Sequence, residues 1–384
     1  MPREHHRRLR ALAAAAASII VASSLAGCTT SGDAMRLHID PHKPFVLAGV
    51  DDLTQIAKLT GPGAINDTAS VGVAGTDLGS MTTIGDKTFF LFGDTFGDRD
   101  PDSYGGQGGF WRSNVSAYST DDDPSDGITF DGWAPSDDIG LAVAMVEGKH
   151  EPDDTGEVTK IPTYGFSVDG ALYIFYMSVR HWGDAGVWDA NYSSLAKSAD
   201  EGRTWSELTP RWPGGSNFIQ VATAHVEDGG TEFVYFWAIP AGRFGGVQLM
   251  RVPATTRDVE DQSAYTYFVG TSPGGAPRWS SDMDAAATVV DGTVGELSVM
   301  WSTYLDRWVM TYSDAGNAYI REGITPWGPW GEPIELAAAS EYPGLYAPFM
   351  NPRYVADGGR TIYFAMSLWG PYNVFWYSVH LDKA

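Results

Sequence analysis

Two aspartates in strand-like segments flank a tight turn in the first quarter of the chain. Asp77 lies in Gly-Thr-Asp-Leu-Gly, and Asp94 lies in Phe-Gly-Asp-Thr-Phe-Gly. Between them Gly85-Asp86 suits the two-residue loop of a type II′ hairpin, because glycine readily adopts the positive φ of the first loop position. Counting pairs outward from this loop places Asp77 opposite Asp94. Directly opposed side chains have Cβ atoms about 5 Å apart, so we expect the two carboxyl groups to be neighbours.

Neighbouring carboxyl groups have a characteristic chemistry. Each charge disfavours ionisation of the other group, which raises the pKa of one of them. A protonated acid beside an ionised carboxylate is what glycoside hydrolysis requires; a separation of about 5 Å favours retention, and about 6.5–9.5 Å favours inversion. The other interpretation is that Asp77 and Asp94 cap turns. Nearby glycines could also introduce bulges that break the register: Gly75, Gly79, Gly93 and Gly97.

The remaining sequence indicates what positions this pair. A Gly/Asp turn followed by an apolar, aromatic-rich run recurs five times, which favours strands. The chain also has 45 glycines, 14 tryptophans, 18 tyrosines and 17 phenylalanines, a composition that favours an all-β fold. Irregular repetition of this kind predicts a five-bladed β-propeller occupying residues 45–384 as one domain, with a two-sheet sandwich as the alternative. The runs are Phe89–Phe92, Leu172–Tyr176, Phe233–Ile239, Trp308–Tyr312 and Ile362–Met366.

A short motif supports the propeller. Ser198–Trp205 matches the Asp-box pattern S-x-D-x-G-x-T-W, in which the aspartate caps a turn and the tryptophan packs beneath a blade. Asp boxes normally lie on the face opposite the active site. We therefore assign Asp200 a structural role and no part in catalysis.

Composition excludes several classes of function. The 48 acidic and 25 basic residues give a formal net charge of −23, which argues against a nucleic-acid partner. The single cysteine excludes an intrachain disulfide and multi-cysteine zinc or iron–sulfur sites. The acidic run 121–127 lacks the spacing of a calcium loop and is interpreted as solvated. We expect no cofactor, no metal and a monomer.

The N-terminus has the pattern of an export signal. Basic residues precede the apolar stretch Ala11–Leu25, which is shorter than the ~20 residues of a spanning helix. It ends in Leu-Ala-Gly-Cys28, which resembles a bacterial lipobox; an ordinary secretory signal is the alternative. The pattern predicts a signal peptide over 1–27, lipidation of Cys28 and a tether over 28–44, giving an extracytoplasmic protein anchored to the membrane. Removing 1–27, with four arginines and one glutamate, changes the net charge from −23 to −26.

The motifs around the aspartates also resemble a known family. GVAGTDLG and FLFGDTFG, followed by WRSNV from Trp111, are similar to bacterial domain of unknown function 4185, which is grouped as glycoside hydrolase family 183. The resemblance covers about residues 45–382. It implies a five-bladed propeller with endo-D-arabinanase activity on α-linked D-arabinofuranose in arabinogalactan and lipoarabinomannan. It maps the catalytic pair onto Asp77 and Asp94 without deciding which is the acid. Further matching segments begin at Tyr176, Asn191, Gly295, Trp327 and Tyr372.

Other polar and aromatic residues are candidates for substrate binding at the mouth of the propeller channel. Each has an ordinary structural alternative, such as turn capping for asparagine or a partly buried histidine. They are Asn114, His181, Trp182, Asn191, Glu296, Tyr346 and Asn351. The main alternative function is a non-catalytic propeller that binds cell-wall glycan. A sialidase is disfavoured because no Arg-x-Pro motif marks a first repeat.

Overall fold

The computed structural model describes residues 34–37, 40, 42–100 and 102–384. The predicted signal peptide, residues 1–27, and the predicted lipidation site, Cys28, lie outside these described residues. Within them, no helix is both long enough and apolar enough to cross a membrane.

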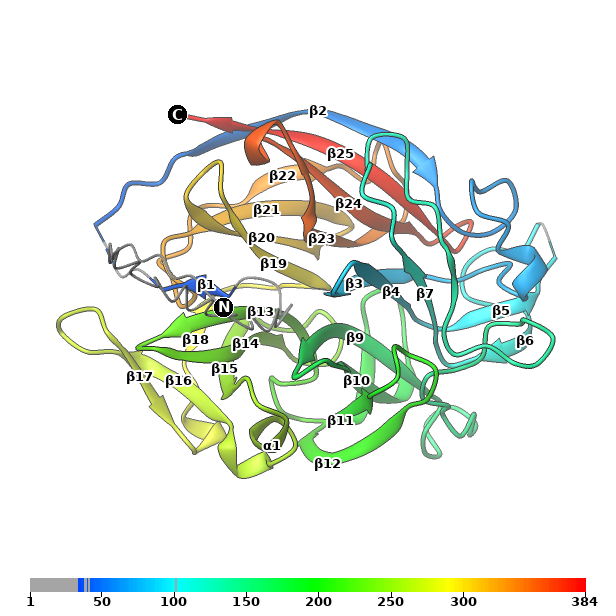
Figure 1. Cartoon of the computed structure of the whole chain (residues 1–384), viewed down its shortest axis with the longest axis horizontal. Coiled ribbons are helices and arrows are strands. Elements are labelled where there is room, and N and C mark those ends of the chain that lie inside the picture. The colour runs from blue at the N-terminus through cyan, green and yellow to red at the C-terminus, as the bar shows by residue number, and fades with distance from the viewer. Residues whose placement is uncertain (1–33, 38–39, 41, 101) are drawn as a thin grey trace, which may run out of the picture.

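Five inner strands form the centre of an all-β propeller (Figure 1). Each inner strand contacts the next one around the ring, and the last contacts the first. In order they are β3 (Leu78–Ile84), β9 (Thr159–Val168), β13 (Gln220–Asp228), β19 (Leu297–Ser302) and β23 (Leu345–Ala356).

Four of the inner strands begin a four-stranded antiparallel blade. The first blade adds β4 (Lys87–Phe92), β7 (Val115–Ser119) and β8 (Gly132–Trp133) to β3. The second adds β10 (Ala171–Trp182), β11 (Trp188–Ser198) and β12 (Ser206–Pro213) to β9. The third adds β20 (Arg307–Asp314), β21 (Asn317–Gly323) and β22 (Ile334–Ala337) to β19. The last adds β24 (Thr361–Leu368), β25 (Asn373–Lys383) and β2 (Leu47–Lys58) to β23, so an early strand completes the sheet that ends the chain.

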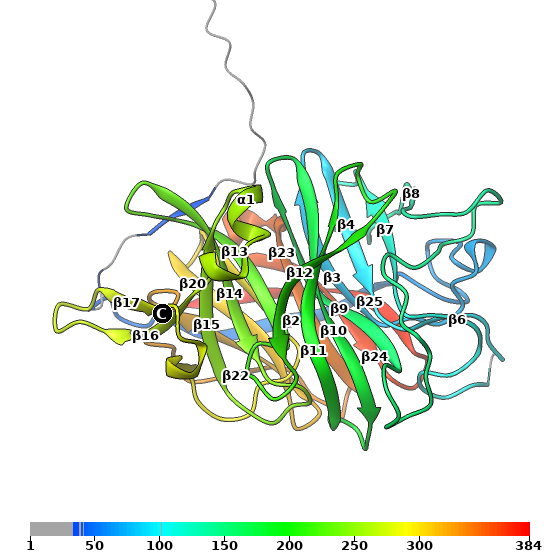
Figure 2. The same ribbon diagram turned by 90° about the horizontal axis from the view of Figure 1, so that it is seen from below.

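The sheet that contains β13 is wider and has seven strands. It lies beside the β9–β12 blade (Figure 2). Besides β13 it contains β14 (Thr231–Ile239), β15 (Val247–Pro253), β16 (Thr266–Thr271), β17 (Pro277–Ser280), β18 (Thr288–Val290) and β1 (Met35–Arg36). The prediction of a five-bladed propeller is therefore corrected: four of the sheets are four-stranded blades, and the sheet around β13 is larger and differs from them. The cause is extra chain: beyond the four strands β13 to β16, the segment after β16 adds β17 and β18, and the N-terminal segment adds β1.

Short elements complete the fold. A two-stranded sheet joins β5 (Thr95–Asp98) to β6 (Gly109–Arg112). The one-turn helix α1 (Thr256–Val259) begins at Thr255, whose side chain accepts a hydrogen bond from the Asp258 N–H. The 3-10 turns are Ala69–Val71, Gln262–Ala264, Met283–Ala285 and Asp357–Gly359.

The strand β1 modifies the prediction of a tether over residues 28–44. Met35 and Arg36 pair in parallel with Val226 and Glu227 of β13. At this point the segment is therefore part of the sheet and not a free spacer.

The hairpin that carries the aspartates differs from its predicted register at one place. Pairing follows the expected count from Ile84 and Lys87 out to Ser80 and Leu91. A bulge then shifts it, because Leu78 and Gly79 both have positive φ, 67° and 85°. Asp77 consequently lies opposite Gly93, whose N–H donates to its carbonyl at 3.2 Å. The prediction that Asp77 is directly opposite Asp94 is wrong by one residue.

The Asp box has the predicted structural role. Asp200 accepts hydrogen bonds from the N–H and the hydroxyl of Thr204, at 2.9 and 2.7 Å. The motif joins β11 to β12 at Ser198, which pairs with Leu172. The other end of the same strand pair, Trp182 with Trp188, lines the cavity described below.

Candidate active site

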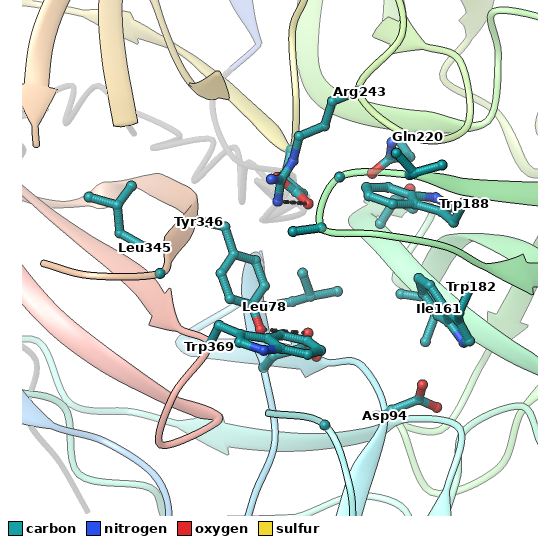
Figure 3. A pocket seen from close by; sticks show the side chains of 18 of the residues that line it. Leu78, Asp94, Ile161, Trp182, Trp188, Gln220, Arg243, Leu345, Tyr346 and Trp369 are labelled. Atoms are coloured by element: carbon teal, nitrogen blue, oxygen red, sulfur yellow. Dashed lines mark hydrogen bonds and ion pairs between the residues drawn. The ribbon is translucent and has the colours of Figure 1, made fainter. Parts of the chain in front are cut away.

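A cavity of about 640 Å³ lies at one end of the ring of inner strands. All five inner strands contribute lining residues from their first few positions: Leu78, Ile161, Gln220, Leu297 and Leu345. Side chains that immediately precede a strand therefore point to a common space. Asp77, just before β3, and Glu296, just before β19, reach the cavity in this way. Asp94, labelled in Figure 3, reaches it from the connection between β4 and β5.

Asp77 is held in a setting that favours its protonated form. Tyr346 donates a hydrogen bond to Asp77 Oδ2 at 2.9 Å. Oδ1 is buried and has no hydrogen-bond partner within the described residues. It lies against Gly93, where any Cβ would overlap it. Burial, followed by the charge of Asp94, raises the Asp77 pKa to about 8, and the charge of Glu296 acts in the same direction.

Asp94 lies in the same cavity but has more hydrogen-bond donors. Its Oδ1 accepts from Trp111 Nε1 at 2.7 Å and from the hydroxyl of Thr159 at 2.6 Å. The indole of Trp111 packs against His150, with ring centroids 3.9 Å apart and the ring planes tilted by 37°. Burial raises the Asp94 pKa to about 7, while the two hydrogen bonds and the nearby His150 oppose the increase. Both carboxyl groups therefore have a raised pKa, and the two donors to Asp94 favour its ionised form more than the single donor, Tyr346, favours that of Asp77.

A family model confirms part of the sequence-based expectation. The model described as "Domain of unknown function (DUF4185)" matches residues 63–378. The chain belongs to the DUF4185 family. A comparison with curated protein sequences finds no match.

Three solved structures that match this DUF4185 chain have low sequence identity to it. A protein from Bacteroides ovatus described as a candidate hydrolase has a TM-score of 0.53 and 15% identity, covering 81% of this chain and 86% of its own. A family 117 glycoside hydrolase from Zobellia galactanivorans has a TM-score of 0.48 and 12% identity, covering 87% and 91%. A GH43_1 enzyme from Xanthomonas citri has a TM-score of 0.46 and 12% identity, covering 85% and 90%. The match to the Bacteroides ovatus protein shows a similarity of fold.

Five of the sequence-predicted site residues of the DUF4185 chain line the cavity. They are Asp77, Asp94, Trp182, Glu296 and Tyr346. Glu296 is paired: its carboxylate binds the Arg243 guanidinium through two hydrogen bonds, of 2.9 and 3.2 Å. The Trp182 side chain is 39% exposed, and the backbone N–H of this residue donates to Asp153 Oδ1 at 3.0 Å.

The other four predicted residues do not line the cavity, and each makes structural hydrogen bonds. Asn114 is fully buried, donates to two backbone carbonyls and accepts from two backbone N–H groups. Asn191 donates to the Gly156 carbonyl and the Ser178 hydroxyl. His181 pairs with Asp153 at 2.7 Å, so it helps to hold the neighbouring Trp182 rather than facing the cavity itself.

Asn351 is the fourth of these residues. It accepts a hydrogen bond from the Arg353 N–H at 2.9 Å and lies further along β23 than Tyr346. The prediction that it contacts sugar is therefore not supported by its position.

Several cavity residues had no signal in the sequence. Arg243 follows an Ala-Gly turn, and its partner Glu296 is far away in the chain, so only the fold brings them together. Trp369 is 43% exposed and packs against Tyr346 and Tyr372, with ring centroids 6.4 and 5.6 Å apart. In Figure 3, Trp369 and Trp182 lie on opposite sides of the cavity. The remaining unpredicted lining side chains with polar or aromatic character are Tyr104, Thr163, Asp184, Trp188, Gln220, Phe349 and Tyr372.

A possible cation cluster lies elsewhere. Among the described residues, Asp51, Asp52 and His380 are close enough in space to share an ion, with their ligand atoms within 4.8 Å of one another. They lie on β2 and β25 and do not line the cavity.

Proposed function

We propose that this protein is an endo-acting glycoside hydrolase that cleaves α-linked D-arabinofuranose chains of arabinogalactan and lipoarabinomannan with Asp77 and Asp94. The observation that carries the proposal is a pair of buried carboxyl groups with raised pKa values in one cavity at the end of the propeller. The preference for D-arabinan comes from the resemblance of the surrounding motifs to glycoside hydrolase family 183.

The different surroundings of the two aspartates support different roles. Asp77, with a pKa of about 8, is the general acid: its proton moves to the glycosidic oxygen as the bond to the anomeric carbon breaks. Asp94 is the ionised partner at the anomeric carbon; water adds its hydroxyl group there and gives its other proton to the carboxylate pair, which restores the protonated acid. Two donors bind Asp94 Oδ1, which leaves Oδ2 for the reaction.

The cavity also suits a sugar chain in its shape and lining. Its volume of about 640 Å³ is typical of a small-molecule site. Exposed indoles such as Trp182 and Trp369 offer flat apolar faces for furanose rings. No metal or cofactor is part of the proposed reaction.

The proposal includes a location and a partner. Export through the signal 1–27 and lipidation of Cys28 would hold a monomeric enzyme outside the cytoplasm on the cell membrane, where its substrate is a wall polysaccharide. The lipobox pattern supports this part.

Product analysis tests the activity. The chain from Thr29 onward, which keeps β1 and lacks the predicted lipidation site, is incubated with arabinogalactan, and released oligosaccharides are measured as new reducing ends. The wild type should release oligo-arabinosides, and Asp77→Asn or Asp94→Asn should abolish release. Full activity in both variants would contradict the assignment. Binding of the glycan without any new reducing ends would instead favour a non-catalytic wall-binding propeller.

A further inference from the structure

Gln220 presents a fixed hydrogen-bond acceptor to the cavity. Its Nε2 donates to the carbonyls of Pro240 and Gly242, at 3.1 and 3.0 Å. Because a carbonyl can only accept, these bonds define the amide orientation and use both protons of Nε2. Within the described part of the chain, no protein group donates to Gln220 Oε1. The side chain lines the cavity although the residue is only 3% exposed.

Arg243 lies beside Gln220 and has an unused donor group. Its Nε and Nη2 bind the two carboxylate oxygens of Glu296, at 3.2 and 2.9 Å. Among the described residues, Nη1 makes no hydrogen bond. Trp188 borders the guanidinium, with its ring 5.9 Å away. The backbone of Arg243 is also held, because its backbone N–H donates to the Gly186 carbonyl at 3.0 Å. The ion pair of Arg243 with Glu296 is therefore firmly positioned.

This cluster is separate from the aspartates but close enough to share a ligand with them. Figure 3 places Arg243 and Gln220 on the side of the cavity away from Asp94. Tyr346 lies between Arg243 and Trp369 in this view. Tyr346 is also the residue that donates to Asp77. A ligand with several hydroxyl groups can therefore contact both groups of side chains within one cavity.

We propose that Gln220, Arg243 and Glu296 form a hydroxyl-binding subsite for a neutral sugar unit next to the unit whose bond is cleaved. The inference rests on the proposed function and deepens it. Gln220 Oε1 accepts from one hydroxyl, Arg243 Nη1 donates to another, and Glu296 keeps the guanidinium in place. A sugar hydroxyl both donates and accepts, so it suits this mixed set of groups.

Charge makes the subsite selective for neutral sugars. The Arg243 charge is cancelled by Glu296 at hydrogen-bond distance, so little positive charge is left to attract a carboxylate. Asp94 in the same cavity repels anions when it is ionised. A sugar acid would therefore lose its hydration without gaining a counter-ion.

Binding to an inactive enzyme tests the subsite independently of turnover. In the Asp94→Asn background, calorimetry measures the Kd of neutral oligosaccharides of equal length, from D-arabinan, xylan and galactan, and of an oligogalacturonate. At least one neutral chain should bind, and Gln220→Met should weaken it about tenfold, as expected for one lost hydrogen bond. The oligogalacturonate should bind at least tenfold more weakly.

The control is Gln248→Met. Gln248 donates to the Ala286 carbonyl at 3.2 Å and does not line the cavity, so its replacement should leave every Kd unchanged. Arg243→Lys, which keeps the charge but loses the two-point contact, should weaken the same neutral chain as Gln220→Met does. Equal effects of the two glutamine variants, tight binding of the sugar acid, or no binding of any neutral chain would overturn the proposal. Binding of xylan or galactan with dependence on Gln220 would retain the subsite and contradict the arabinan assignment.

Discussion

Aspartates at the two ends of the propeller have opposite environments. At the cavity end, burial raises the pKa of Asp77 and Asp94. At the other end, Asp200 accepts hydrogen bonds from the backbone and hydroxyl of Thr204, which lower its pKa. Asp169, in the β9–β10 turn, accepts from the Thr256 N–H, and its pKa is lowered for the same reason.

The two kinds of aspartate differ in what stabilises the negative charge of the ionised carboxylate. A turn aspartate is ionised in water and gains hydrogen bonds, so its charge favours the folded state. A buried aspartate with few donors loses hydration, so its charge disfavours the folded state. Only the second kind can hold a proton near neutral pH, which a general acid needs. Aspartates at the cavity end can therefore take part in proton transfer, whereas those at the opposite end stabilise turns of the fold.

The largest expected effect separates the two buried aspartates from each other. Asp94→Asn should lower kcat by about 10³-fold or more for every substrate, because no negative charge remains at the anomeric carbon. Asp77→Asn should cause a similar loss on arabinan, but less than about tenfold on a dinitrophenyl arabinofuranoside, whose leaving group needs no proton. Steady-state kinetics on both substrates measure this. Equal losses for both variants on the activated substrate would contradict the role given to Asp77.

A smaller effect is expected from crowding Asp77. Gly93→Ala places a Cβ where Asp77 Oδ1 lies, so the carboxyl group must move. We expect kcat to fall by about 10- to 100-fold and the free energy of unfolding to fall by about 1–3 kcal/mol. Gly215→Ala is the control, since nothing lies within 4 Å of a Cβ there and its kinetics and stability should stay close to wild type. Unchanged kinetics for Gly93→Ala would mean that the position of Asp77 is unimportant.

Removing single hydrogen bonds should move one limb of the pH profile at a time. The active form has Asp94 ionised and Asp77 protonated, so activity should rise near pH 7 and fall near pH 8. A donor favours the charged carboxylate, so its loss raises the pKa. Thr159→Val should therefore shift the acid limb upward by about one pH unit. Tyr346→Phe should shift the alkaline limb upward instead.

Measurements of kcat/KM against pH test this pair of shifts. Trp111→Phe, which removes the other donor to Asp94, should reproduce the Thr159→Val profile. If Tyr346→Phe moved the acid limb instead, the assignments of the two aspartates would have to be exchanged.

The smallest effect concerns the opposite end. Asp200→Ala should lower the free energy of unfolding by about 1 kcal/mol through the loss of its turn hydrogen bonds, and kcat should not change. Asp86→Ala, in the exposed turn of the first hairpin, makes a matched control, because within the described residues its side chain accepts no hydrogen bond. Denaturant unfolding and kinetics measure both variants. A loss of activity in Asp200→Ala would remove the contrast between the two ends.

Local patterns in the sequence were sufficient for features that depend on neighbouring residues. The Asp box was identified because Asp200 and Thr204 are close in the chain. The Gly85-Asp86 turn was also predicted, and the strands pair around it as expected. The bulge at Leu78 and Gly79 was not predicted, since glycine permits a positive φ without requiring it.

Contacts between distant segments could not be predicted in the same way. Tyr346 meets Asp77 and Arg243 meets Glu296 only because the inner strands converge on one end of the ring. Asn114 and Asn191 have the polar character of sugar-binding residues, yet Asn114 bonds to backbone groups and Asn191 donates to the Gly156 carbonyl and the Ser178 hydroxyl. The number of strands in the β13 sheet likewise depends on β1, which is contributed by the remote N-terminal segment.

The place where β1 joins the propeller bears on how the enzyme would face the cell wall. Met35 and Arg36 pair with Val226 and Glu227, whereas Gln220 at the other end of β13 lines the cavity, about 20 Å away along the strand. The chain from Cys28 to Met35 can extend at most about 25 Å. A lipid on Cys28 would therefore hold the propeller near the end of β13 that lies away from the cavity, so the cavity would open away from the bilayer. In that orientation the short segment between Cys28 and Met35 would keep each enzyme molecule close to the membrane. The enzyme would then reach only the wall polymer that lies near the membrane.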